Sequence, residues 1–123
     1  MKPILSTEEV RRLEDIIERE GTSKAELMEH AGEFVAAVAQ EYDPKEVVVL
    51  TGFGNNGGDG WVAADILQQR GAHVTVATPV GPSEVPSALA RHVARRTSGR
   101  DVEVVVGPSR DELADLLSGA DLV

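Results

Sequence analysis

Apolar residues in the first third of the chain recur every three or four positions, which predicts two amphipathic helices. Each helix has a start signal, because Ser6 and Ser23 precede Glu9 and Glu26 at the spacing of a capping box. The first helix is expected to end at Gly21, and its apolar face consists of Val10, Leu13, Ile16 and Ile17. The second stops at Tyr42-Asp43-Pro44, and its apolar positions are Leu27, Met28, Ala31, Phe34, Val35 and Val38.

Beyond residue 44, short apolar runs alternate with segments of helical spacing. Val47–Leu50 is continuous and largely β-branched, which is typical of a strand buried on both faces of a parallel sheet. A glycine-rich segment, Gly52–Gly60, leads into a helix that stops at Gly71 and carries Val62, Ala63, Ile66 and Leu67. Further along, we expect strands at 73–77 and 102–106, helices at 88–96 and from Ser109, and the start of a fourth strand at 120–123.

The last predicted helix repeats the signals of the first two. Ser109 and Glu112 form a third capping box, and the buried face is expected to consist of Leu113, Leu116 and Leu117. The repeated order of strand and helix predicts an α/β fold. We expect a Rossmann-like three-layer α/β/α arrangement, with a parallel sheet of three full strands plus a fourth-strand stub, preceded by two N-terminal helices. Residues 1–123 would form one domain with the strand order 3-2-1-4.

The composition restricts the partners and the compartment. Twenty-one acids against twelve bases give a net charge of −9, which would repel nucleic acids and anionic membranes, so neither is an expected partner. The absence of cysteine excludes disulfides and zinc sites built on cysteine. No apolar run reaches about 18 residues and no signal-peptide core is present, so a cytoplasmic location is predicted. The acidic, lysine-poor composition is typical of salt-adapted proteins, although ordinary cytoplasmic proteins share it.

The segment Gly52–Gly60 carries the clearest functional signal. Five of its nine residues are glycine, which permits positive φ and lets the backbone approach a ligand closely. Because the segment joins a strand to a helix, free N–H groups and the positive end of the helix dipole face one point, which favours a phosphate. Gly52, Gly54 and Gly57 satisfy the dinucleotide-binding fingerprint in this context. An ordinary dehydrogenase is not favoured, because residues 77–79 lack the acid that would hold a ribose.

A more specific signature lies inside this segment, namely Asn55-Asn56-Gly57-Gly58-Asp59-Gly60. Together with residues 27–32 (Leu-Met-Glu-His-Ala-Gly), it closely resembles the YjeF N-terminal domain family, the NAD(P)H-hydrate epimerases, and the resemblance spans nearly the whole chain. The resemblance implies a Rossmann-like fold and an isomerase that interconverts the two epimers of hydrated NADH or NADPH. It also implies a partner dehydratase, as a kinase-like domain or a separate protein, that repairs one of these forms.

The resemblance also assigns roles to residues. The stretch that contacts the hydrated dinucleotide corresponds to Asn55, Asn56, Gly57, Gly58 and Asp59, and Asn56 matches a ligand of the family's potassium ion. His30 departs from the family pattern, which usually has asparagine there. The family continues its fourth strand into a Val-Asp-Ala segment and later supplies an aspartate near the reacting ring. This sequence contains neither, so we expect the domain to be truncated and the catalytic proton-transfer residue is unknown.

Simpler interpretations of the same residues stay open. Asp59 could be the N-cap of the following helix, and Asn55 and Asn56 could be turn formers. Trp61 is expected to pack in the core. The histidines lack the spacing of metal ligands and are expected to be structural or solvated: His30, His73 and His92. An alternative function is a non-catalytic nucleotide-binding or protein-interaction module of the same fold. Since the first strand would have a poorly covered flank, we also expect a homo-oligomer.

Overall fold

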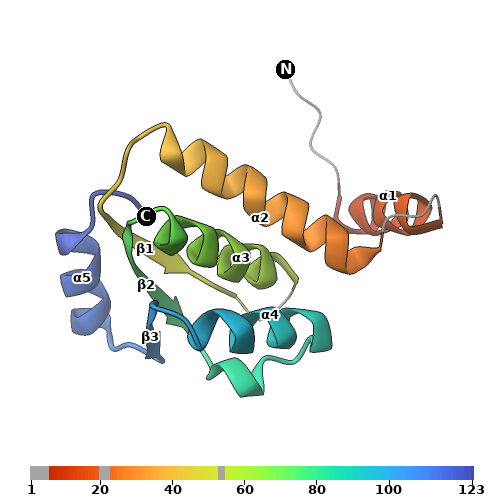
Figure 1. The fold of residues 1–123 in the computed structure, drawn as a ribbon. Coiled ribbons are helices and arrows are strands. Elements are labelled where there is room, and N and C mark those ends of the chain that lie inside the picture. The colour runs from red at the N-terminus through yellow and green to blue at the C-terminus, as the bar shows by residue number, and fades with distance from the viewer. Residues whose placement is uncertain (1–5, 20–22, 53–54) are drawn as a thin grey trace.

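The computed structural model describes residues 6–19, 23–52 and 55–123 and shows an α/β fold (Figure 1). The three strands form one parallel sheet and are β1 (Glu46–Leu50), β2 (His73–Thr78) and β3 (Glu103–Val106). The helices are α1 (Thr7–Arg19), α2 (Lys24–Gln40), α3 (Asn55–Gln69), α4 (Ala88–Ser98) and α5 (Arg110–Gly119), with a short 3-10 helix, η1, at Pro82–Glu84. The predicted order of strands and helices is therefore confirmed.

The capping signals place the helix starts as expected. The hydroxyl of Ser23 accepts a hydrogen bond from the backbone N–H of Glu26 at 3.1 Å. At the start of α5, Ser109 and Glu112 form the complete capping box, in which each side chain accepts from the other residue's N–H. The same reciprocal pair joins residues 6 and 9 before α1. Two otherwise unpaired N–H groups are satisfied at each complete box, which explains why these positions begin helices.

The sheet has the order β1-β2-β3, and the C-terminal residues lie on the free side of β1. Leu122 forms an isolated parallel bridge with Val47, and its carbonyl accepts from the N–H of Val48 at 3.0 Å. The carboxylate of Asp121 accepts from the N–H groups of Lys45 and Glu46. The structure assigns no fourth strand, but this bridge puts the predicted stub beside β1, as the order 3-2-1-4 requires.

Helices cover the two faces of the sheet unequally. Helices α3 and α4 connect the three strands and pack on one face, and α2 lies over α3 (Figure 1). Helix α5 lies on the other side of the sheet, beside β1. Consecutive parallel strands that are joined by right-handed crossovers require this arrangement, because the crossover changes face only where the strand order reverses.

Helix α2 packs through the predicted apolar residue Met28 and through three small residues that the apolar pattern did not include. Met28, Gly32, Ala36 and Ala39 are buried, and we call their contact with α3 the helix seam. A Cβ at Gly32 would lie 2.3 Å from Cγ1 of Val62, so only glycine allows this approach. Three larger apolar side chains of α2 are exposed, namely Phe34, at 70%, Val35 and Val38.

The predicted buried face of α5 is also wrong. Leu113 and Leu116 are only half-buried, and Leu117 is exposed. No residue of α5 is buried, because the sheet beside it is three strands wide and α5 lies near its β1 edge. Amphipathic spacing therefore predicted the helix correctly. It did not predict how much of the helix the rest of the chain buries.

Candidate glycine-rich site at the end of β1

The glycine-rich segment begins where β1 ends, but most of it is helical. Helix α3 starts at Asn55, so the predicted loop of residues 52–60 is reduced to residues 52–54, of which 53 and 54 lie outside the described residues. Glycine has a low helix propensity, and the sequence pattern therefore placed the helix start too late. Tertiary packing overrides that propensity here.

Each described glycine at the start of α3 has a packing reason. A Cβ at Gly57 would lie 2.6 Å from the carbonyl oxygen of Gly52. A Cβ at Gly58 would meet the end of the Met28 side chain at 2.5 Å, and one at Gly60 would meet Val49 at 3.2 Å. None of these glycines has positive φ, so the conformational reason given by the sequence is wrong for them. They allow α3 to start close against its neighbours.

The early helix start changes the interpretation of the polar residues. Asp59 is the fifth residue of α3, so it is not the N-cap. Asn55 and Asn56 have helical backbones and are not turn formers, while their side chains lie outside what the structure describes. The N–H groups of the first three residues of α3, which include Gly57, have no acceptor within the helix. Together with the helix dipole, they make the end of β1 suitable for an anionic group.

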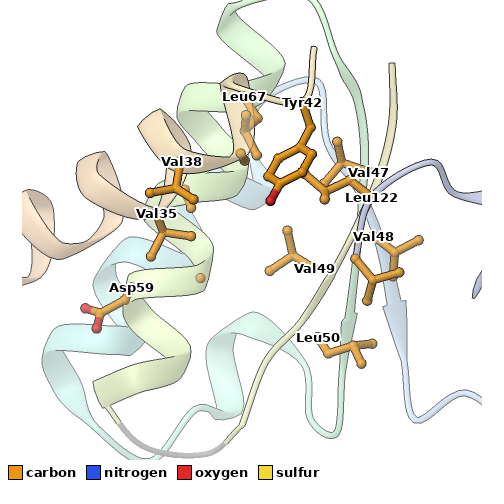
Figure 2. A pocket seen from close by; sticks show the side chains of 14 residues that line it. Val35, Val38, Tyr42, Val47, Val48, Val49, Leu50, Asp59, Leu67 and Leu122 are labelled. Atoms are coloured by element: carbon orange, nitrogen blue, oxygen red, sulfur yellow. The ribbon is translucent and has the colours of Figure 1, made fainter. Parts of the chain in front are cut away.

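An apolar groove runs from this glycine-rich turn along the free side of β1 (Figure 2). Its volume is about 610 Å³. In Figure 2, Asp59 lies on the α3 side, across the groove from Leu50, and Tyr42 lies close to Leu122. The groove is lined by Val35, Val38, Ala39, Tyr42, Val47, Val48, Val49, Leu50, Asp59, Gly60, Ala63, Leu67, Leu122 and Val123. Sequence reasoning anticipated the uncovered flank of β1 but not the contribution of α2.

The remaining candidates from the sequence lie away from the turn. Trp61 is buried, at 1% exposure, which confirms its predicted packing role. His30 and His92 are exposed. His73 lies between Glu46 and Glu103, and these carboxylates raise its pKa by hydrogen bonding. Within the described ranges, no cluster of His, Asp and Glu could hold a metal ion, and no helix is long and apolar enough to cross a membrane.

The site has one feature that the sequence did not signal. The hydroxyl oxygen of Thr51, directly after β1, is buried and has no hydrogen-bond partner among the described residues. A threonine between a strand and a glycine-rich turn is common enough that its type gives no warning. Only the structure shows that this hydroxyl lacks a partner, whereas the hydroxyls of Thr78 and Thr97 donate hydrogen bonds.

An open parallel sheet with a glycine-rich turn where the strand order reverses is typical of a doubly wound α/β domain. The model of the family "YjeF-related protein N-terminus" matches residues 24–123, and the chain belongs to this family. It is 34% identical to a Rhodobacter capsulatus protein named NAD(P)H-hydrate epimerase, over 99% of this chain and 64% of that one. It is 49% identical to the Methanospirillum hungatei "Bifunctional NAD(P)H-hydrate repair enzyme Nnr", over 59% of this chain and 15% of that one.

The fold comparison agrees with the family. A crystal structure of the yeast protein YNL200c superposes with a TM-score of 0.76 and 26% sequence identity. The alignment covers 92% of this chain and 51% of the yeast chain. The chain thus spans about half of that structure, and between 15% and 64% of these two curated relatives.

Proposed function

We propose that this chain takes part in the epimerisation of hydrated NADH and NADPH, with the turn at the end of β1 binding the dinucleotide. The observation that carries the proposal is the Asn55–Gly60 signature at the start of α3, in a chain whose relatives include proteins named NAD(P)H-hydrate epimerase. Unpaired N–H groups and the helix dipole at this point favour a phosphate. The dinucleotide contacts are assigned to Asn55, Asn56, Gly57, Gly58 and Asp59.

A potassium ion belongs to the same proposal, with Asn56 as one ligand. Two described oxygen atoms next to the turn are of the kind that hard cations bind. The buried hydroxyl of Thr51 has no partner, and the carbonyl oxygen of Gly52 faces the first turn of α3. Asp59 lies on α3, the helix that also carries Asn56. When bound, the ion would offset the negative charge of the dinucleotide and fix the positions of these oxygen atoms.

No described residue at the turn is assigned to proton transfer, which epimerisation by acid–base chemistry requires. The role proposed for this chain's residues is therefore to bind and orient the hydrated nicotinamide nucleotide. The relatives named as bifunctional repair enzymes favour a dehydratase, fused or separate, as the partner that consumes the product.

Binding and exchange should be measured separately. The proposal expects hydrated NADPH to change the fluorescence of Trp61, next to the signature, and the amide signals of Gly57 and Gly58. It expects the two epimers, followed by chromatography, to interconvert faster with the protein than in buffer. Asn56→Ala should weaken binding about tenfold, through loss of an amide contact to a charged group. Glu84→Ala, in the exposed η1, is the matched control.

The alternative function is a non-catalytic binding module of the same fold. This alternative is favoured by the fact that no residue of the sequence is assigned to proton transfer. Saturable binding of hydrated NADPH without epimer exchange would select the module over the enzyme. If the dinucleotide leaves both the fluorescence and the amide signals unchanged, the turn is not its site.

A further inference from the structure

Residues 85–100 are a basic segment in a chain whose net charge is −9. They contain four of the nine arginines and no Asp or Glu, and they include the whole of α4. Three of these arginines lie on that helix, namely Arg91, Arg95 and Arg96, together with His92. The surface around α4 therefore has a local positive potential, opposite in sign to the charge of the whole chain.

Helix α4 has one face against α3 and one face in solvent. Its buried residues are Ala90, Val93, Ala94 and Thr97. The hydroxyl of Thr97 donates to the carbonyl of Trp61 at 3.1 Å, and a Cβ at Gly58 would lie 3.2 Å from the Cβ of Ala90. The basic residues recur every three or four positions on the opposite face of the helix. They therefore point away from α3 and from the glycine-rich turn.

The exposed face of α4 carries a shallow hollow with a volume of about 510 Å³. It is lined by Ala88 and by Arg91, His92, Arg95 and Arg96, and we call these four basic residues the basic strip. From residue 88 to residue 96 a helix rises about 12 Å. Small-molecule sites bring a few polar groups together in a deep cleft. A row of cations along one helix is instead suited to an elongated anionic partner.

The guanidinium groups of the basic strip are only partly satisfied within the chain. Arg96 donates to a Glu29 carboxylate oxygen at 2.7 Å, and Arg91 donates to the carbonyl of Val85 at 3.1 Å. Among the described residues, no carboxylate forms an ion pair with Arg91 or with Arg95. These two cations lie one helical turn apart, where like charges destabilise a helix. Carboxylates from outside the chain would bind the unused N–H donors and offset this repulsion.

We propose that the basic strip is a docking surface for an acidic segment of a partner protein. Carboxylates one helical turn apart on the partner would face Arg91 and Arg95, which have the same spacing. A short acidic segment meets only the local positive potential of α4. A nucleic acid or an anionic membrane extends beyond it and is repelled by the net charge of −9. The basic strip is separate from the proposed dinucleotide site, because it lies on the opposite face of α4.

The test uses a fluorescein-labelled peptide of ten glutamates as the acidic probe, with binding to the full chain followed by fluorescence anisotropy. We expect saturable binding at low ionic strength that weakens as sodium chloride is added. Arg95→Glu should bind the peptide about tenfold more weakly, because it replaces an attraction by a repulsion in the middle of the strip. Arg95→Gln replaces this variant if circular dichroism shows that it does not fold.

Arg110→Glu is the matched control, because it changes the net charge by the same amount at the exposed start of α5. It should bind the peptide nearly as well as the wild type. Hydrated NADPH, followed by the fluorescence of Trp61, should bind equally to the wild type and to Arg95→Glu. This second measurement keeps the basic strip and the proposed function separate, since either one can fail without the other.

Five results would overturn the proposal. Equal peptide binding by the wild type and Arg95→Glu would exclude the basic strip, and an equal loss in Arg110→Glu would mean that only net charge matters. Tighter binding of a ten-nucleotide single-stranded DNA than of the peptide would assign the surface to nucleic acid. Complete displacement of the peptide by millimolar inorganic phosphate would indicate a single-anion site. A dimer of this chain that Arg95→Glu dissociates, without peptide binding, would make a second copy the occupant.

Discussion

The helix seam and the free side of β1 are opposite in character, although both belong to the surroundings of α3. At the seam, small side chains bring α2 against α3 so closely that glycine is required at residue 32. On the free side of β1, large apolar side chains line a groove that the described residues leave open. The first region is closely packed among the described residues, and the second leaves apolar side chains accessible to another surface. The candidate site lies at the boundary between them, where rigid packing positions the turn and the open flank gives access to it.

The largest expected effect is at the seam. Gly32→Val places a branched side chain where even a Cβ would lie 2.3 Å from Val62 and 3.0 Å from the backbone of Asp59. Neither neighbour can move without displacing α3, so we expect a loss of about 3 kcal/mol or more in unfolding free energy. Urea denaturation measures it. Gly119→Ala, where a Cβ meets nothing within 4 Å, is the control and should change stability little. Equal effects of the two substitutions would mean that the seam is not tightly packed.

A smaller effect is expected where α3 is tied to the segment after α4. The Asp65 carboxylate is buried and accepts hydrogen bonds from Arg100, Gln68 and Gln69. Burial alone would raise the pKa of Asp65, but these hydrogen bonds together outweigh it and lower the pKa. The lowered pKa stabilises the fold above the unfolded value of 3.8, and this contribution is lost as the pH falls through the folded value.

Arg100→Ala should therefore cost about 1–3 kcal/mol near neutral pH, because it removes a charged donor from a buried carboxylate. The expected loss of unfolding free energy is smaller than for a fully buried ion pair, because the Arg100 side chain is 44% exposed. Urea denaturation at pH 7 and in acid measures the effect, which should shrink in acid as Asp65 becomes protonated. Arg70→Ala, at the exposed end of α3, is the control. A cost that is the same at every pH would exclude the carboxylate as its cause.

The sequence predicted the seam and the groove to different degrees. Apolar spacing and the Ser–Glu pairs located the strands and helices, because capping and periodicity are local properties. They did not show that α2 packs through Gly32 and Ala36 instead of Phe34, since this depends on how closely α3 approaches. The pairing of Asp65 with Arg100 and the unsatisfied hydroxyl of Thr51 also depend on residues that are distant in sequence. The residue types at 55–60 were enough to recognise the signature, but they did not predict that its backbone is helical.

The open side of β1 predicts self-association. Phe34, on α2, and Tyr42, just after that helix, are each 70% exposed, and Leu50 is 52% exposed at the end of β1. The same surface offers a concave groove and protruding aromatic side chains, so a second copy can bury both in a two-fold contact. We propose a second copy as the occupant and expect light scattering to show a dimer that dissociates on dilution.

Phe34→Ser should weaken this dimer about tenfold, because one exposed apolar side chain loses its contact area. Val10→Ser, at an exposed apolar position on α1, is the control for a general change in solubility. Molar salt should strengthen the dimer by screening the net charge of −9 on each copy. A monomer at all concentrations would show that another surface covers the groove, or that it stays open.

The smallest effect is expected at the start of the strands, far from the groove's open end. His73 begins β2, and its Nδ1 and Nε2 atoms lie 2.7 Å from a Glu46 oxygen and 3.3 Å from a Glu103 oxygen. Hydrogen bonds to these carboxylates raise the pKa of His73 above 6.5. A raised pKa means that the folded state binds the proton more tightly.

The resulting stability is complete below pH 6.5 and is lost as the pH rises through the folded value. Because all three side chains are at least half exposed, solvent screening limits the effect to a few tenths of a kcal/mol. Nuclear magnetic resonance titration of the ring protons should place the His73 midpoint above 6.5. His73→Gln should remove the corresponding pH dependence of the melting temperature, while His92→Gln should not. A His73 midpoint at or below 6.5 would contradict the cross-strand arrangement.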